Sequence, residues 1–454
     1  MDLNQNIFRA NDIRGIAYED LSESVVTDLG KALGSESLER NITQFIIGRD
    51  ARLSSPDIFE WLSSGVLSTG CNVIDIGLVT SPMFYFSTFE LNTSSGVVIT
   101  GSHNPGEYNG FKIVFENRST SSEEILDIKR RILKKDFFRG AGTIKSADIK
   151  ENYIDRIVSD ISIKENLKIS IDCGNGAAGV VAKKVYEALG CEVIELFGEP
   201  DGNFPNHHPD PSKPENVKDL IESVIDNRSK IGLAFDGDAD RLGVISPKGK
   251  MIYPDMQMIL FSKQVIKSNP GAKIVFDIKC SKLLSDAVLA EGAVPIMVKT
   301  GHTFIKQEIR KNKAHLGGEM SGHIFFNDRW PGFDDGIYAG ARMLEIISKN
   351  NEEDVFETLP FLFSTPEINV ATSDDEKFEL VENFKQNSNF ENAEIIDIDG
   401  IRVNFESGWG LLRASNTSPV LVLRFEAESE EYLEEIKNSF YLNLKKLKKD
   451  LQEF

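Results

Sequence analysis

The chain has 454 residues, of which 41% are hydrophobic and 27% charged, a composition typical of folded globular proteins. At roughly 100 to 200 residues per domain, this length predicts three or four domains. The 51 Lys and Arg residues against 71 Asp and Glu residues give a net charge of -20, and a surface of that sign repels nucleic-acid phosphates and anionic lipid. Every apolar run is shorter than the ~20 residues that cross a bilayer. We therefore expect neither a nucleic-acid partner nor a membrane partner.

The N-terminal sequence MDLNQNIFRANDIRG lacks the basic start and apolar middle of a secretory signal, so we expect a cytoplasmic location. The cysteines have no CxxC spacing, which disfavours both a zinc site and a disulfide framework. We expect reduced, mostly buried thiols at Cys71, Cys173, Cys191 and Cys280.

A strand, helix, strand pattern occurs three times along the chain. Each copy has an apolar run, a helix-length amphipathic stretch that ends in glycine, and a second apolar run. The copies open at residues 44–50, 168–176 and 273–280, and their helices are expected to end at Gly70, Gly190 and Gly292. Glycine adopts the left-handed conformation that often closes a helix. This order predicts parallel strand pairs joined by right-handed crossovers.

Each copy is followed by another strand-like segment that leads into a polar loop: SGVVIT before GSHNP, KIGLAF before DGDADR, and KAHL before GGEMSGH. Because ligands bind at the carboxyl ends of strands in open α/β sheets, these loops should face a common cleft. After about residue 366 shorter strands and a long charged helix follow, typical of a smaller α+β domain. We expect three similar α/β domains with mixed sheets (1–150, 151–251 and 252–365) and a C-terminal α+β domain (366–454) around a central active-site cleft.

Three aspartates, Asp236, Asp238 and Asp240, alternate in the loop DGDADR. Carboxylates so close together repel one another, and a bound divalent cation is the simplest compensation. An EF-hand would need glycine and glutamate where this loop has Arg241 and Pro247, so calcium sensing is disfavoured. Three hard oxygen ligands favour Mg²⁺. The alternative is an acidic surface turn.

Ser102 lies in TGSHNP, directly after an apolar run. Thr100 stands two residues before it, so the G-x-S-x-G elbow of hydrolases is absent. A serine can also carry a phosphoryl group, and then needs a metal to balance roughly two negative charges. The aspartate loop would supply that metal. The alternative is a strand-ending turn in which His103 and Asn104 make local hydrogen bonds.

The loop GEMSGH presents a carboxylate, a hydroxyl and an imidazole in alternation at Glu319, Ser321 and His323. Several hydrogen-bonding groups on one loop suit the recognition of adjacent sugar hydroxyls, because an unpaired buried polar group costs ~1 to 3 kcal/mol. An ordinary polar turn remains the alternative.

A fourth loop, RASNTSP, combines a cation with short hydrogen-bonding side chains. This set could surround a phosphate dianion, and the alternative is a capping turn. The residues concerned are Arg413, Ser415, Asn416 and Thr417.

FRANDIRG, TGSHNP followed by YNGFK, DGDADR, GEMSGH and RASNTSP occur in this order. With these motifs the chain resembles the α-D-phosphohexomutase superfamily over essentially its full length, and most closely the bacterial phosphomannomutase/phosphoglucomutase branch. The resemblance implies an enzyme that interconverts hexose 1-phosphates and hexose 6-phosphates of mannose, glucose or both. The implied route uses a phosphoserine enzyme, Mg²⁺ and a hexose 1,6-bisphosphate that serves as intermediate and activator.

The resemblance also implies roles for individual residues. Ser102 would carry the phosphoryl group and would hold the metal together with Asp236, Asp238 and Asp240. The reaction centre would be lined by Arg14, Lys112, Arg241, His302 and His323. Either histidine could be the general base, or it could position hydroxyls. The sugar would contact Lys279, Glu319 and Ser321, and the phosphate that is not transferred would contact Arg413, Ser415, Asn416 and Thr417.

Two departures and two alternatives accompany this interpretation. Asn11 replaces a tyrosine common in relatives, so any ring contact with substrate is lost there or supplied by another residue. Ala239 replaces a glycine and leaves the carboxylate spacing intact.

A phosphoglucosamine mutase is the alternative within the superfamily, although its members usually have glutamine in place of Met320. A non-catalytic sugar-phosphate-binding protein is the other alternative. We expect a monomer or weak dimer, and the preferred epimer stays open.

Overall fold

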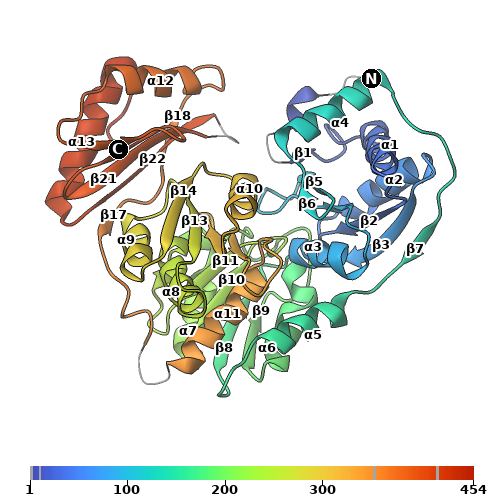
Figure 1. Cartoon of the computed structure of the whole chain (residues 1–454), viewed down its shortest axis with the longest axis horizontal. Coiled ribbons are helices and arrows are strands. Elements are labelled where there is room, and N and C mark those ends of the chain that lie inside the picture. Colours follow the sequence, from blue (N-terminus) through green and yellow to red (C-terminus); the bar gives the residue numbers. More distant parts are fainter. Residues whose placement is uncertain (1–3, 10–11, 351–353, 416–418) are drawn as a thin grey trace.

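The computed structural model describes residues 4–9, 12–350, 354–415 and 419–454. In this part of the chain four β-sheets follow one another along the sequence, each with helices packed against it (Figure 1). The second and third sheets lie side by side, and the first and fourth units lie on opposite sides of them in the view (Figure 1). Among the described residues, no helix is long and apolar enough to cross a membrane.

The first sheet has the strand order β1-β5-β4-β2-β3-β7, with β6 paired to β5. β2 is parallel to β3 and β4, whereas β5 is antiparallel to β4 and β1, so the sheet is mixed, as expected. Its strands are β1 (Ile13–Ile16), β2 (Gln44–Arg49), β3 (Asn72–Leu78), β4 (Gly96–Ile99), β5 (Tyr108–Phe115), β6 (Arg118–Ser119) and β7 (Ile144–Ser146). Its helices are the 3₁₀ turn η1 (Gln5–Ile7), α1 (Glu23–Glu39), α2 (Ser55–Leu67), α3 (Ser81–Glu90) and α4 (Ser122–Lys134).

The second sheet has the order β12-β11-β10-β8-β9, in which β8 is parallel to β9 and β10, and β11 is antiparallel to β10. Its strands are β8 (Lys168–Asp172), β9 (Glu192–Leu196), β10 (Gly232–Phe235), β11 (Leu242–Ile245) and β12 (Met251–Ile252). The associated helices are α5 (Lys150–Asp160), η2 (Ala177–Val180), α6 (Ala182–Ala188), η3 (Pro214–Asn216) and α7 (Lys218–Asn227).

The third sheet has the order β14-β13-β15-β16, with β13 parallel to β14 and β15, and β16 antiparallel to β15. Its elements are α8 (Pro254–Ser268), β13 (Lys273–Asp277), α9 (Lys282–Ala290), β14 (Val294–Val298), α10 (His302–Asn312), β15 (Leu316–Gly318), β16 (Ile324–Phe326) and α11 (Gly336–Lys349). All three predicted repeats are therefore parallel strand pairs. The glycines that follow their helices, Gly70, Gly190 and Gly292, have φ of +96°, +89° and +71°, as a left-handed cap requires.

The second and third sheets share one hydrophobic core. Helix α11 packs against β10 and β11 of the second sheet as well as against its own sheet. The Tyr153 hydroxyl of α5 donates to the Asp335 carboxylate at 2.9 Å, and the Tyr186 hydroxyl of α6 donates to the Ile337 carbonyl at 3.0 Å. These buried contacts join the two units into one platform.

The fourth sheet has the order β17-β22-β21-β20-β19, with β18 paired to β22, and matches the expected smaller α+β unit. Its elements are β17 (Phe363–Ser364), β18 (Ile368–Ala371), α12 (Lys377–Asn387), β19 (Glu394–Ile396), β20 (Ile401–Asn404), β21 (Gly408–Ala414), β22 (Val420–Ala427) and α13 (Glu430–Leu447). Its sheet contacts the third unit through buried arginines. Arg424 pairs with Asp255 at 3.0 Å, and Arg402 donates to the Ile278 and Cys280 carbonyls at 2.7 Å. All four cysteines are free and buried, as predicted.

Candidate active site

Ser102 lies in the loop between β4 and β5, with only 2% of its surface exposed. Its backbone has a φ of +49°, in the left-handed region that few residues other than glycine adopt. Its Oγ donates to Asp236 Oδ2 at 2.8 Å and lies 3.0 Å from His103 Nδ1, and its amide donates to Thr100 Oγ1 at 2.9 Å. The hydroxyl is therefore held against the aspartate loop of the second sheet.

The aspartate loop begins where β10 ends, and Asp236, Asp238 and Asp240 are completely buried. Lys112, on β5 of the first sheet, places its ammonium between Asp238, at 2.5 Å, and Asp240. Burial and the charges of its two neighbours raise the pKa of Asp236 well above its usual value. Burial acts in the same direction on Asp238, but the Lys112 ammonium outweighs it and lowers the pKa of that carboxyl.

The three aspartates fit a divalent cation. Their carboxylate oxygens lie within 4.8 Å of one another. Among the described residues, Asp238 Oδ1 and Asp240 Oδ1 are buried with no hydrogen-bond partner. Buried oxygens left unpaired in this way are costly unless a ligand or ion meets them. The donor set consists of hard carboxylate oxygens, which suit Mg²⁺ better than a soft metal.

The sequence analysis missed Ser81, at the start of α3, which also holds the aspartate loop. Its hydroxyl donates to Asp238 Oδ2, and its amide donates to the Asp238 carbonyl at 2.9 Å. The only local signal was a helix start, with Thr80 as the N-cap and Pro82 in the first turn. Nothing in that pattern connects it with a loop more than a hundred residues away.

The two predicted arginines of the reaction centre take different positions. Arg14 on β1 donates to the Asn104 side chain, in the Ser102 loop, and pairs with Asp12. Arg241 lies with its Nε 3.9 Å from Asp236 Oδ2 and donates from Nε to His323 Nε2 at 3.2 Å. The aspartate loop and the GEMSGH loop thus meet at Arg241.

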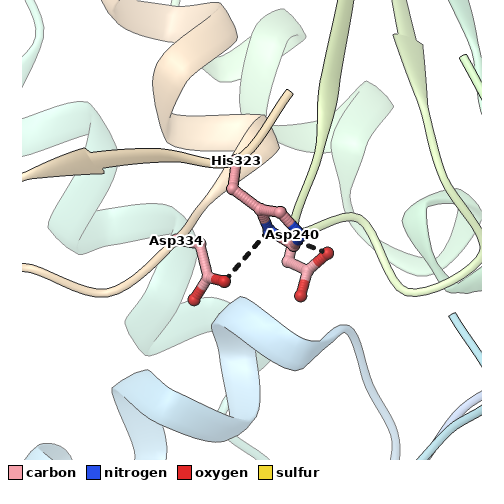
Figure 2. Close-up of side chains that lie close together, drawn as sticks. All are labelled: Asp240, His323 and Asp334. Atoms are coloured by element: carbon pink, nitrogen blue, oxygen red, sulfur yellow. Dashed lines mark ion pairs between the residues drawn. The ribbon is translucent and has the colours of Figure 1, made fainter. Parts of the chain in front are cut away.

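Figure 2 shows His323 between two carboxylates, Asp240 and Asp334. His323 Nδ1 lies 3.1 Å from Asp334 Oδ2 and 3.5 Å from Asp240 Oδ1. Because Nε2 accepts a hydrogen bond from Arg241, the hydrogen-bond network assigns the proton of a neutral ring to Nδ1, which faces the carboxylates. His323 is thereby oriented with Nε2 as the basic nitrogen.

Asp334, also missed by the sequence analysis, is completely buried. Lys306 lies 2.6 Å from Asp334 Oδ1, and this ammonium together with His323 holds the pKa of Asp334 well below its usual value, although burial opposes the shift. Asp334 stands in PGFDDG, just before α11, outside every strand-ending loop of the repeat. In the sequence this segment is marked by two adjacent acidic residues, Asp334 and Asp335, which do not by themselves indicate a functional role.

His302 begins α10 and stacks on His323, with ring centroids 5.5 Å apart. Its Nδ1 lies 3.8 Å from Asp334 Oδ2. Burial and the nearby Lys306 ammonium lower the pKa of His302 well below its usual value. His302 is therefore a neutral imidazole near pH 7, and it lies beside the reaction centre, next to Asp334 and His323.

The predicted sugar contacts lie near the boundary between the third and fourth units. Lys279 donates to Glu367 Oε1 at 2.6 Å, in the segment between β17 and β18. Glu319 accepts a hydrogen bond from the Gly301 amide at 2.6 Å, and burial raises the pKa of its carboxyl. Ser321 is half-buried in the turn that follows Glu319.

Arg413 lies near the end of β21, with 4% of its surface exposed. Its Nε donates to Asp399 Oδ2 at 2.9 Å, and the same oxygen accepts from the Thr300 amide of the third unit at 3.1 Å. Among the described residues, Arg413 Nη2 is buried without a hydrogen-bond partner. Ser415 is buried close by, whereas the predicted contacts Asn416 and Thr417 lie outside the described residues.

The structure therefore brings three predicted loops together: the Ser102 loop of the first unit, the aspartate loop of the second unit and the GEMSGH loop of the third. Direct contacts connect Ser102 with the aspartate loop, that loop with Lys112, and Arg241 with His323. Lys279 and Arg413 belong to a second group, each paired with its own carboxylate.

Comparison with known families assigns the whole chain. Four phosphoglucomutase/phosphomannomutase models match in order: alpha/beta/alpha domain I at residues 5–139, domain II at 151–249, domain III at 253–361, and the C-terminal domain at 367–442. The chain belongs to the phosphoglucomutase/phosphomannomutase family. It is thus a phosphohexomutase, and the resemblance inferred from the motifs is confirmed.

Individual relatives are similar over their full length. A phosphomannomutase/phosphoglucomutase of Pseudomonas syringae pv. tomato is 49% identical over 99% of this chain and 97% of its own length. A phosphoglucomutase of Neisseria gonorrhoeae is 47% identical over 96% of both chains. The crystal structure of a phosphoglucomutase/phosphomannomutase family protein from Burkholderia thailandensis covers 100% of both chains, at 42% identity and a TM-score of 0.94.

Proposed function

We propose that this enzyme interconverts the 1-phosphates and 6-phosphates of glucose and mannose through a phosphorylated Ser102 and a hexose 1,6-bisphosphate. The observation that carries the proposal is the buried hydrogen bond from Ser102 Oγ to Asp236, next to a lysine that lies between two further aspartates. A serine hydroxyl among metal-binding carboxylates and cations suits phosphoryl transfer. Each of the four proposed domains (1–150, 151–251, 252–365 and 366–454) contributes one loop.

Transfer begins when a sugar hydroxyl attacks the phosphorus of phosphoserine 102. An O–P bond to the sugar forms, the Oγ–P bond of Ser102 breaks, and the hydroxyl proton moves to a base. His323 Nε2 is the base that the geometry favours, because the Nδ1 proton of this ring already faces Asp334 and Asp240. Nε2 accepts a hydrogen bond from Arg241, which would have to turn to the phosphoryl group before Nε2 takes the proton. Asp334 then stabilises the imidazolium. In the second half-reaction the other phosphate returns to Ser102 and the proton flows back.

Charge balance supports the roles of the cations around Ser102. Three carboxylates and a phosphate dianion total about -5, and Mg²⁺ bound by Asp236, Asp238, Asp240 and a phosphate oxygen on Ser102 would supply +2. Arg14, Lys112 and Arg241 are close enough to offset the remainder. Lys112 contacts Asp238 and Asp240 and offsets part of their negative charge. When a metal binds these carboxylates, the Lys112 ammonium would be available to a phosphate.

The second group of residues would hold the part of the substrate that does not react. Arg413 has a buried guanidinium nitrogen without a partner among the described residues, which favours a phosphate contact. Ser415, Asn416 and Thr417 would complete this phosphate site. Lys279, Glu319 and Ser321 would contact the sugar hydroxyls. The intermediate has to turn over between the two half-reactions, so the same site accepts either phosphate.

The experiment that tests the proposal measures kinetics with glucose 1-phosphate, mannose 1-phosphate and glucosamine 1-phosphate in parallel. Each assay contains Mg²⁺ and a trace of glucose 1,6-bisphosphate. We expect conversion of the first two substrates and far slower conversion of the third. Intact-mass and peptide analysis should locate one phosphate on Ser102. A protein that converts none of the three, or that carries phosphate elsewhere, would refute the proposed function.

A further inference from the structure

Arg52, just after β2, makes an unusual number of contacts with the Ser102 loop. The side chain has only 1% of its surface exposed. Nη2 donates to the carbonyls of Ser102 at 2.8 Å and Asn104 at 2.6 Å, and Nη1 donates to those of Pro105 at 2.5 Å and Tyr108 at 2.8 Å. One guanidinium thus donates hydrogen bonds to four carbonyls of a single loop.

The opposite side of the guanidinium faces Asp50. Asp50 Oδ2 lies 3.2 Å from Arg52 Nε and accepts a hydrogen bond from the Gly101 amide at 3.2 Å. Asp50 Oδ1 accepts from the Arg52 amide at 3.0 Å and from Ser55 Oγ at 2.7 Å. The loop therefore contacts this ion pair through both its carbonyls and an amide.

The guanidinium of Arg52 packs closely against the backbone of Gly101. A Cβ added at Gly101 would lie 2.5 Å from Arg52 Cζ and 2.5 Å from Nε. This glycine, immediately before Ser102, is needed because the backbone lies against the guanidinium. The φ of Gly101 is not positive, so alanine is compatible with its backbone and would be excluded only by the contact with Arg52.

We propose that Arg52 is a positioning residue for phosphoryl transfer: it fixes the carbonyls of the 102–108 loop so that Ser102 Oγ points at Asp236. The inference rests on the function proposed above. Arg52 is buried behind the loop and acts on the reacting atoms through its hydrogen bonds to the Ser102 loop. A planar guanidinium with five donors suits four carbonyls and a carboxylate, whereas the three donors of a lysine ammonium cannot reach them all.

The physical consequence concerns the rate more than binding. Without the guanidinium, buried carbonyls lose their donors and the loop relaxes toward other partners. A displacement of about 1 Å at a reacting group can cost ~100-fold in rate. Substrate contacts on the third and fourth units are unaffected, so kcat should fall while KM changes little.

Arg52→Lys is the test, with Arg342→Lys as a matched control. Arg342 is also 1% exposed and pairs with Asp328 at 2.9 Å, but it lies on α11 and has no contact with the Ser102 loop. We expect kcat for glucose 1-phosphate to fall roughly 30- to 100-fold in Arg52→Lys, with KM within about threefold. Arg342→Lys should lower the melting temperature and leave kcat within about twofold. If Arg52→Lys keeps its kcat, or if both variants lose it equally, the positioning role is wrong.

Gly101→Ala provides a second measurement should Arg52→Lys not fold. Its methyl group separates the loop from the guanidinium without removing a charge, and the same pattern of low kcat and unchanged KM is expected. Wild-type kcat in Gly101→Ala would overturn the inference. Ser102→Ala separates this inference from the proposed function: if Ser102→Ala remains active, the proposed function fails, whereas an inactive Ser102→Ala with a fully active Arg52→Lys contradicts the role of Arg52 alone.

Discussion

The charged side chains of the reaction centre around Ser102 are paired differently from those of the substrate-recognition group, which contains Lys279 and Arg413. Around Ser102 the aspartates are completely buried, and a single lysine, Lys112, lies between two of them. At the boundary of the third and fourth units each cation has a carboxylate of its own: Lys279 pairs with Glu367, and Arg413 pairs with Asp399. The side chains of Glu367 and Asp399 are 34% and 16% exposed, whereas those of Lys279 and Arg413 are 9% and 5% exposed, so solvent reaches these pairs from the carboxylate side.

This difference corresponds to two tasks. Preorganised charges in a site that excludes water stabilise the transition state without rearrangement, which suits the Ser102 centre. A binding group must instead release one anion and accept another as the bisphosphate intermediate turns over. Ion pairs whose carboxylates are partly exposed exchange partners at a lower cost than completely buried pairs. Substitutions in the first region should therefore affect the rate most, and those in the second should affect binding or stability.

Ser102→Ala is expected to have the largest effect, because alanine cannot carry a phosphoryl group. Turnover should fall below ~0.1% of wild type, the range expected when a covalent nucleophile is removed. Binding of glucose 1-phosphate, measured by calorimetry, should largely survive. Mass spectrometry should find no phosphate at this position in the variant. Normal mutase activity in Ser102→Ala would show that Ser102 does not carry the phosphoryl group, and the region around it would no longer differ from the recognition group in its role.

Metal removal should have the next largest effect. Chelation with EDTA should stop turnover and added Mg²⁺ should restore it, because the aspartate loop offers hard oxygen ligands. Asp238→Asn should weaken Mg²⁺ binding, measured by calorimetry, and lower kcat on the order of 100-fold. The variant should remain folded, which circular dichroism checks. Full activity in demonstrably metal-free protein would contradict the metal role of residues 236 to 240.

Arg413→Ala tests the recognition group. Loss of a charged, bidentate contact should cost on the order of 2 to 3 kcal/mol, or roughly 30- to 150-fold in kcat/KM. The loss should be expressed mainly in KM, and equally for glucose 1-phosphate and mannose 1-phosphate, because the contact is with phosphate. A defect limited to one epimer would show that Arg413 reads the sugar.

Much of the fold and part of the site could be predicted from local sequence patterns. The three repeats predicted β2 with β3, β8 with β9 and β13 with β14 as parallel pairs, because apolar runs and helix-ending glycines are local signals. The loops after β4, β10 and β15 were also expected to meet. Ser102 and Asp236 are accordingly in contact, although 134 positions separate them.

Residues that act by supporting others could not be predicted in this way. Asp334, Ser81 and Arg52 stand outside the four loops that the sequence predicted as functional, and each acquires its role through contacts made across the folded chain. The shared core of the second and third units was equally hidden, since α11 follows the third sheet in sequence yet also packs on β11. Long-range packing of this kind leaves no periodic pattern in the sequence.

The smallest expected effect concerns Glu367, which pairs with Lys279. Lys279, with contributions from Arg424 and Arg413, lowers the pKa of Glu367 from 4.5 to about 2. A carboxyl whose pKa is lower in the folded state stabilises the protein above pH 4.5, and the stabilisation disappears as the pH falls toward 2. Because the side chain is 34% exposed, solvent screening reduces the contribution to ~1 to 2 kcal/mol at pH 7.

Glu367→Gln should therefore lower the free energy of unfolding at pH 7 by ~1 to 2 kcal/mol. The gap to wild type should narrow below pH 4.5 and close as the pH approaches 2. Urea unfolding followed at several pH values measures this gap. Glu391→Gln, an exposed position in the turn before β19 of the same unit, is the matched control and should unfold like the wild type at each pH. Because the substitution also frees Lys279, KM for the hexose 1-phosphates should change by only a few fold while kcat is retained. A large loss of kcat with unchanged stability would instead place Glu367 with the reaction centre and weaken the division between the two regions.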